Sequence, residues 1–140
     1  MAGHRIVEID CDGNAKQMRC PDGCEDFGAW CRSRLGGHLQ PLRNRPPIKH
    51  WRQCKLEAIV DEEGVPKGLR YNGFAHDVLA KLGFEVGSIC GTVLVLASGP
   101  MPPLGECDLC GLTDDMLAFV AKALESCKAA RRAPSPPFAT

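Results

Sequence analysis

The chain has 140 residues, of which 44% are hydrophobic, and its seventeen basic side chains balance seventeen acidic ones. A chain of this length normally builds one hydrophobic core, and zero net charge gives no general attraction to nucleic acid or to a membrane. No window approaches the roughly 18 apolar residues of a membrane span, and no apolar stretch typical of a signal peptide opens the chain, so we expect a cytoplasmic protein with no membrane contact.

Three strands and a helix are expected in the first third of the chain. Residues 4–10 and 14–20 alternate in polarity on either side of an Asp-Gly pair, which favours a β-hairpin. A helix is expected over residues 23–35, because its start has the Asp-x-x-Glu spacing of a capping box and Gly36 can end it. Residues 38–42 then predict a short strand before several prolines interrupt regular structure.

The middle of the chain is expected to form the centre of the fold. Residues 56–60 predict a strand, residues 65–69 return beyond an acidic turn, and residues 73–82 predict a short amphipathic helix that Asn72 can cap. Residues 88–96 are the most apolar and most strand-like run of the sequence. We therefore expect this run to be the central strand of the sheet.

The last predicted element is a helix that Thr113 caps. Beyond it, residues 129–140 form a basic, proline-rich tail that lacks the means to bury apolar surface and is expected to be disordered. Hairpins interrupted by single helices favour an α+β fold. The sequence therefore predicts a single α+β domain over residues 1–128, with a mostly antiparallel sheet and two to three helices packed against it.

Three runs within this framework carry a resemblance: DEEGVPKGLRYN at residues 61–72, CGTVLVL at 90–96 and LTDDM at 112–116. Their acidic-Gly turn, Gly-Leu and Asn pair, Gly-Thr-hydrophobic strand and Leu-Thr-Asp helix start resemble a small domain of unknown function encoded by bacteriophages and mobile elements. The resemblance covers about residues 5–128 in outline. It implies a non-enzymatic accessory protein that binds and blocks a host macromolecule in the host cytoplasm, with inhibition of a host defence as the expected role. It transfers no catalytic residue.

A basic segment departs from the pattern of that family. Seven basic residues and no acidic one lie between Arg32 and Lys55. Arginine beside an aromatic ring can stack on bases, lysine can meet phosphates, and the same groups can grip an acidic protein. The alternative is a solvated loop whose charges offset acidic clusters elsewhere. The candidate partner-binding residues are Arg43, Arg45, Lys49, His50, Trp51 and Arg52.

The cysteines form a second candidate site. The chain contains nine of them, and without a secretory signal we expect thiols rather than a disulfide framework. Cys107 and Cys110 have the C-x-x-C spacing of half a zinc site, and Cys20 and Cys24 could supply the other two thiolates. Zinc is therefore the candidate cofactor. The alternative is a set of separate thiols that pack as small apolar side chains, with no cofactor.

Three classes of function follow from these features. No histidine stands at a recognised catalytic spacing and no Gly-rich phosphate loop is present, so we expect a protein that is not an enzyme. The leading hypothesis is binding of a host protein or nucleoprotein complex through the basic segment. The second is nucleic-acid binding by the same segment. The third is binding of a nucleotide or another small molecule in a cleft between sheet and helices, or stabilisation by zinc.

Overall fold

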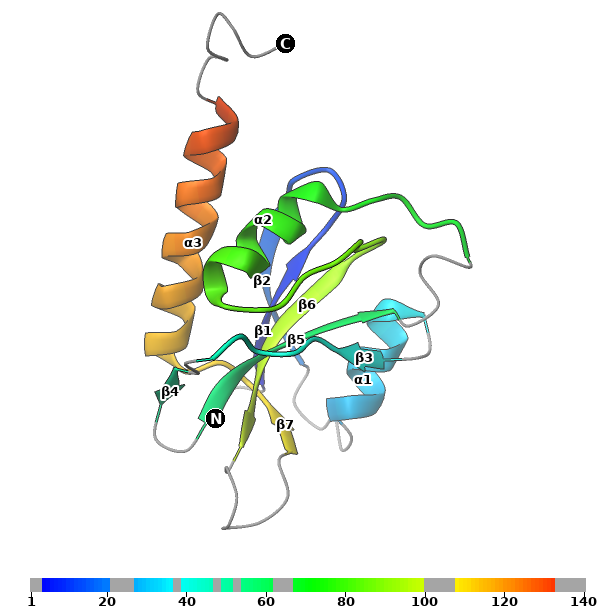
Figure 1. The fold of residues 1–140 in the computed structure, drawn as a ribbon. Helices are drawn as coiled ribbons and strands as arrows, with labels where there is room; N and C mark the ends of the chain where they lie inside the picture. Colours follow the sequence, from blue (N-terminus) through cyan, green and yellow to red (C-terminus); the bar gives the residue numbers. More distant parts are fainter. Residues whose placement is uncertain are drawn as a thin grey trace, which may run out of the picture.

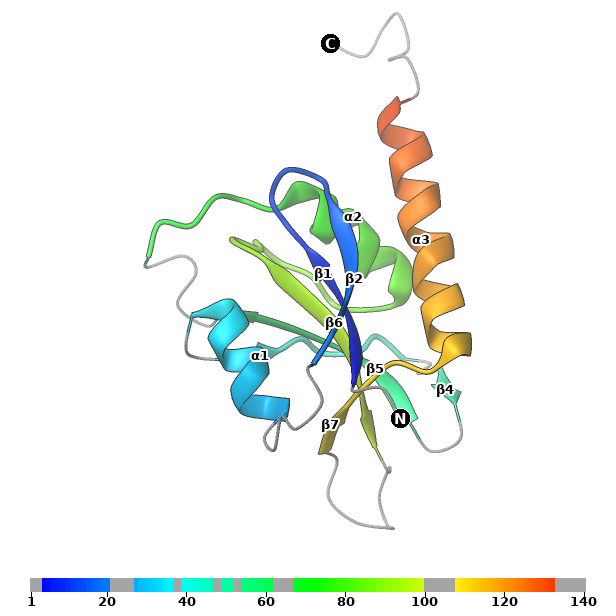
Figure 2. The same cartoon turned by 180° about the vertical axis from the view of Figure 1, so that it is seen from behind.

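The described residues form an α+β fold in which one antiparallel sheet has helices on both faces (Figures 1 and 2). The predicted fold class is therefore confirmed. The computed structural model describes the backbone of Gly28, His50, Asp108 and Arg132, and describes both backbone and side chains for the remainder of residues 4–20, 27–36, 39–46, 49–51, 54–61, 67–99 and 108–132.

Strand β6 (Val93–Gly99) lies at the centre of the sheet and is buried at every position. Its neighbours are β1 (Arg5–Ile9) and β5 (Cys54–Asp61), and all of the pairings are antiparallel. The outer strands are β2 (Ala15–Arg19) beside β1, β3 (Leu39–Pro41) and β4 (His50–Trp51) beside β5, and β7 (Asp108–Cys110) beside β6.

The period-2 alternation of the strands divides the core into two clusters. Val93 and Val95 of β6 pack in a cluster with helices α2 (Gly73–Leu82) and α3 (Asp114–Arg132). Leu94 and Leu96, which point the other way, pack with helix α1 (Phe27–Leu35). Successive side chains of a strand lie on opposite faces, so a strand that is apolar throughout must be covered on both.

The helix boundaries follow the capping residues that the sequence indicates. The side chain of Asn72 accepts a hydrogen bond from the N–H of Ala75, and Gly83 ends α2 with a φ of 99°. The hydroxyl of Thr113 accepts from the N–H of Met116 at the start of α3. Within the described ranges, no helix combines the length and the apolar character needed to cross a bilayer.

The central strand begins later than the sequence predicts. Residues 88–92 are not part of β6, because backbone hydrogen bonds join this segment to the residues before α2: Asn72 N–H donates to Ile89 and Gly91 N–H donates to Arg70. Gly91 has a φ of 89°, and a Cβ there would lie 2.8 Å from Cδ1 of Leu69. The positive φ and the close side chain require glycine and turn the chain out of the sheet.

Other boundaries also differ from the predicted ones. Helix α3 continues to Arg132, so the backbone of residues 129–132 is helical rather than part of a disordered tail. Residues 67–68 form a turn and residue 69 is not in a strand, so this is not the end of a returning strand. The capping box at residues 22–25 lies outside the described residues. The short strands β4 and β7 were not predicted, because two- and three-residue strands have too few residues to show a period.

Candidate functional site

After β3 the chain leaves the sheet and is fixed against the end of α2. The N–H of Arg45 donates to the carbonyl of Gly83 at 2.7 Å, and the carbonyl of Arg43 accepts from the N–H of Glu85 at 2.8 Å. Between them, the side chain of Asn44 accepts from Lys55 of β5 at 3.0 Å. Residues 43–45, the start of the segment predicted as a loop or extended edge, are thus anchored by hydrogen bonds, while the side chains of Arg43 and Arg45 stay exposed.

A group of aromatic rings stands beside this segment. The ring of Trp51 meets the ring of Phe119 of α3 edge to face, with centroids 5.3 Å apart and planes at 67°. The Nζ of Lys49 lies 5.1 Å from the Trp51 centroid and 5.4 Å from the Phe119 centroid. Edge-to-face packing and a cation over two rings are both favourable contacts, so they hold Lys49 and Trp51 in place.

The anchored segment and the aromatic group enclose a hollow of about 170 Å³. Its apolar floor comes from Leu56 and Leu82, and Arg45 and Lys49 line its rim. The volume is below the range of about 300–1,000 Å³ that is usual for small-molecule sites. The hollow therefore suits one side chain of a partner better than a free metabolite. We call Arg43, Arg45, Lys49, Trp51 and Phe119 the basic corner.

The cations of the basic corner carry uncompensated charge. Arg43, Arg45 and Lys49 form no ion pair with any residue that the structure describes, and none of the described residues that line the hollow is acidic. Several arginines elsewhere on the surface are paired, as Arg5 is with Asp114 at 2.6 Å. The basic corner therefore presents a local positive potential on a chain that has no net charge.

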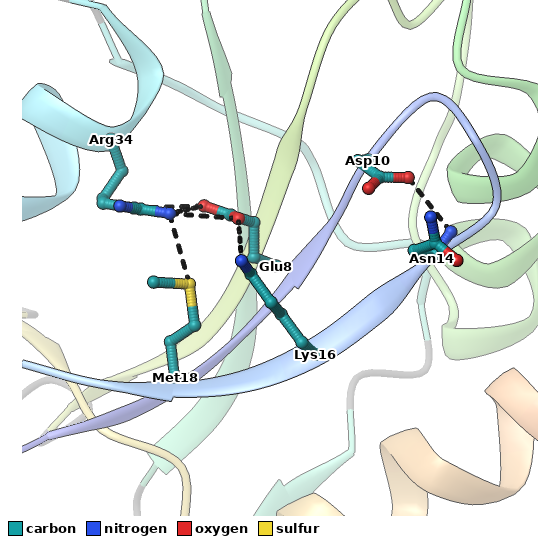
Figure 3. Close-up of polar contacts among 6 residues, drawn as sticks. All are labelled: Glu8, Asp10, Asn14, Lys16, Met18 and Arg34. Carbon is teal, nitrogen blue, oxygen red and sulfur yellow. Dashed lines mark hydrogen bonds and ion pairs between the residues drawn. The ribbon is translucent and has the colours of Figure 1, made fainter.

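Only part of the basic run lies at this corner. Arg45, Lys49 and Trp51 line the hollow together, and Arg43 lies two residues before Arg45. Only the backbone of His50 is described, and Arg52 lies outside the described residues. Arg34 is on α1, on the other face of the sheet, where it bonds to Glu8 of β1 (Figure 3).

Phe119 and the α2 terminus were not expected in the candidate site. Phe119 follows the buried Met116 by three residues on α3, so it falls at the border of the helix's buried stripe. A large aromatic residue at such a border is a weak signal that another group packs against it.

Two of the four candidate zinc ligands lie within the described part of the chain, Cys20 and Cys110. Cys24 and Cys107 lie outside the described residues. Cys20 is 1% exposed within the cluster that α1 covers, whereas Cys110 packs against the cluster of α2 and α3. Among the described residues, no three or more His, Cys, Asp or Glu side chains are grouped as metal ligands would be.

Comparison of the chain with protein-family models, with curated proteins and with solved structures found no match.

Proposed function

We propose that this protein is a non-enzymatic binding protein whose basic corner occupies an acidic patch on a host protein or nucleoprotein complex and thereby blocks it. Its resemblance to a phage and mobile-element domain supports a partner in the host cytoplasm and makes a component of a host defence system the favoured target. The proposal concerns the surface formed by Arg43, Arg45, Lys49, Trp51 and Phe119.

The observation that carries the proposal is three unpaired cations on a fixed frame beside a half-buried tryptophan. Arginine and tryptophan are the residues most enriched among those that dominate binding energy at protein interfaces. The backbone hydrogen bonds to Gly83 and Glu85 hold residues 43–45 in place before any partner binds. A pre-ordered surface loses less conformational entropy on binding, so more of the contact energy remains as affinity.

The environment of Trp51 favours a protein partner over a single-stranded nucleic acid. Stacking on a base requires a free aromatic face. The Trp51 ring already has the Lys49 ammonium over it and the Phe119 ring against it, and it is only partly exposed. Asp or Glu side chains of a partner can instead enter the hollow between Arg45 and Lys49, where charge-assisted hydrogen bonds are available.

The test compares two triple variants as bait for partners from the natural host. The first variant combines Arg43→Ala, Arg45→Ala and Lys49→Ala. The second variant removes three exposed cations that do not line the hollow, through Arg32→Ala, Lys81→Ala and Lys122→Ala. We expect the first variant to lose the partner that the unmodified protein retains and the second to keep it. Both should melt within a few degrees of the parent, because all six side chains are exposed. Equal retention by both variants would contradict the proposal.

Nucleic-acid binding at the same corner is the second candidate, because three cations could neutralise phosphates there. It predicts binding to duplex DNA or RNA of any sequence, with an affinity that falls about 500-fold for each tenfold rise in salt if three phosphates are neutralised on B-DNA. Saturable binding of one acidic protein that persists at high salt favours the first candidate.

A further inference from the structure

A second cavity lies at the other end of α2, away from the basic corner. It has a volume of about 630 Å³ and forms where the β1–β2 turn, the start of α2 and the last turns of α3 meet. Because α2 has ten residues, its two ends are about 15 Å apart, so this cavity and the hollow at the basic corner are separate. Its volume is in the range usual for small-molecule sites.

Most of the charged residues in the cavity walls are cationic. Arg70, Lys128 and Arg131 line it, and the carboxylate that faces them in the lining is Asp12. Asp12 is bound to Arg70 at 2.6 Å, with both side chains about two-thirds exposed, 66% each. An ion pair so exposed contributes little, so Arg70 can exchange it for a phosphate oxygen at low cost.

Lys128 is the cation with the least compensation. It is half-buried on α3 and forms neither an ion pair nor a hydrogen bond with a described residue. Arg131, one turn further along, bonds to Asp77 at 3.1 Å, but Asp77 is not in the cavity wall. The cavity lining therefore carries an excess of positive charge, which selects an anionic ligand.

An aromatic ring of the cavity lining, that of Tyr71, lies near one of these cations, Arg131. A Cβ at Gly73 would lie 3.3 Å from Cε2 of Tyr71 and 3.4 Å from Nη2 of Arg131, so the missing side chain lets both approach the same point. The guanidinium of Arg131 also lies over the ring of Phe74, 5.3 Å from its centroid. Tyr71 itself is 53% exposed, which leaves ring surface for a planar group to stack on.

The amide groups at the start of α2 are not needed for this attraction. The Asn72 side chain accepts from the N–H of Ala75, and the Asn72 carbonyl accepts from the N–H of His76. The positive potential of the cavity comes from the side chains of Arg70, Lys128 and Arg131.

We propose that this cavity binds a small phosphate-bearing molecule with a planar ring, the chemistry of a mononucleotide. Arg70, Lys128 and Arg131 hold the phosphates, and the ring stacks on Tyr71. This site is independent of the basic corner, so a partner protein and a small ligand can be bound at the same time.

The test uses ADP as the probe on the full chain, with adenosine and inorganic phosphate as its separate parts. ADP at millimolar concentration should raise the melting temperature, because a ligand that binds only the native state stabilises it by mass action. Lys128→Ala should weaken ADP binding about tenfold, whereas Lys122→Ala, which removes an exposed lysine from the same helix, should leave it unchanged. Tyr71→Leu should weaken binding of ADP and adenosine but not of phosphate. Absence of any shift with ADP, or equal effects of the two lysine variants, would overturn the proposal.

A second measurement needs no variant. The Cys11 thiol lines the cavity, where its Sγ lies 3.3 Å from the carbonyl oxygen of Arg70, whereas the partly exposed Cys54 on β5 does not. We expect ADP to slow alkylation of Cys11 by iodoacetamide and to leave the rate at Cys54 unchanged, as read by peptide mass mapping. Equal Cys11 rates with and without ADP would also overturn the site. Loss of partner capture by the basic-corner variant is a separate outcome, so the two proposals can fail independently.

Discussion

Arg34 of α1 and Glu8 of β1 are joined by three hydrogen bonds across the interface between helix and sheet. Arg34 Nε donates to Oε1 of Glu8 at 3.1 Å, and Nη2 donates to Oε1 and Oε2 at 2.9 and 3.1 Å (Figure 3). Glu8 keeps only 11% of its side chain exposed, and the Nζ of Lys16 is 3.9 Å from its carboxylate. The pair ties α1 to the sheet at the edge of the cluster that the helix covers.

Arg34→Ala should lower the free energy of unfolding by about 1–3 kcal/mol, because it leaves a poorly solvated carboxylate without its main donor. Arg34→Lys should recover only part of this loss, since an ammonium cannot donate to both oxygens in the planar geometry of a guanidinium. Urea denaturation measures both. Arg32→Ala is the matched control, because Arg32 is exposed on the same helix and forms no ion pair with a described residue. Equal losses for the two alanine variants would show that the bonds to Glu8 contribute nothing specific.

Asn72 is the polar side chain on which several elements depend. It is fully buried, its Nδ2 donates to the carbonyls of Ile9 and Gly91 at 3.1 and 2.9 Å, and its Oδ1 accepts from the N–H of Ala75. Asn72→Ala should cost about 2–4 kcal/mol of unfolding free energy, because it removes the cap of α2 and two buried hydrogen bonds to backbone carbonyls.

Urea denaturation measures this loss, and Asn72→Asp in the same experiment separates capping of α2 from donation to the two carbonyls. A carboxylate can still cap the helix but cannot donate to the two carbonyls, and it would bury a charge. We expect it to be at least as destabilising as alanine. If Asn72→Asp instead keeps most of the stability of the parent protein, capping alone explains the residue.

The acid sensitivity of the β1–β2 turn depends on Asp10. Burial of the carboxyl acts to raise its pKa, but the net effect of its surroundings holds the pKa below its ordinary value of 3.8. The groups that lower the pKa are the backbone N–H groups of Asn14 and Asp12 and the Asn14 side chain, which donate hydrogen bonds, and the positive charge of Lys16. The hydrogen bond from the N–H of Asn14 is 3.0 Å long and the one from the N–H of Asp12 is 2.9 Å long; the bond from Asn14 spans the turn (Figure 3). Because the native state holds the proton more weakly than the unfolded state, the carboxylate stabilises the fold above the ordinary pKa. That contribution is lost as the pH falls through the folded-state pKa.

Asp10→Asn should therefore be less stable than the parent near neutral pH, and the difference should shrink as the pH falls from about 5 to about 2. Urea denaturation across that range measures the difference. Glu125→Gln serves as a control for loss of one negative charge, since Glu125 is exposed on α3 and forms no ion pair with a described residue. A difference between parent and Asp10→Asn that is constant with pH would contradict the role given to this carboxylate.

The aromatic pair of the basic corner should influence both stability and the environment of Trp51. Phe119→Leu keeps an apolar side chain but removes the ring that Trp51 and Lys49 contact, and we expect a loss of about 1 kcal/mol. In a Trp30→Phe background, Trp51 becomes the only tryptophan, because the chain contains two. Its emission should then shift to longer wavelength and be quenched more readily by acrylamide when Phe119 is replaced. Unchanged emission and quenching would show that Phe119 does not shield the indole.

Much of the local structure could be predicted because the signals are local. Asn72 and Gly83 bound α2, Thr113 begins α3, and an Asp-Gly turn joins β1 to β2, each through a contact within a few residues. The run that contains β6 is apolar on both faces, which is enough to place it at the centre of a covered sheet. The predicted element boundaries were wrong where a segment distant in the chain takes the backbone hydrogen bonds. Residues 88–92 show this, because their backbone forms hydrogen bonds with residues 70–72 instead of with a strand.

The sequence by itself determined the fold class, the caps of α2 and α3, the central strand and the presence of a basic segment, because each depends on composition, period or a neighbour in the chain. Only the tertiary structure decided which of those basic residues meet. It places Arg34 on one face of the sheet, and Arg45 and Lys49 on the other, beside Phe119 from a helix about seventy residues later. It also brings Arg70, Lys128 and Arg131 together around one cavity. Contacts between residues so far apart are set by how strands and helices pack, and no local pattern in the chain records them.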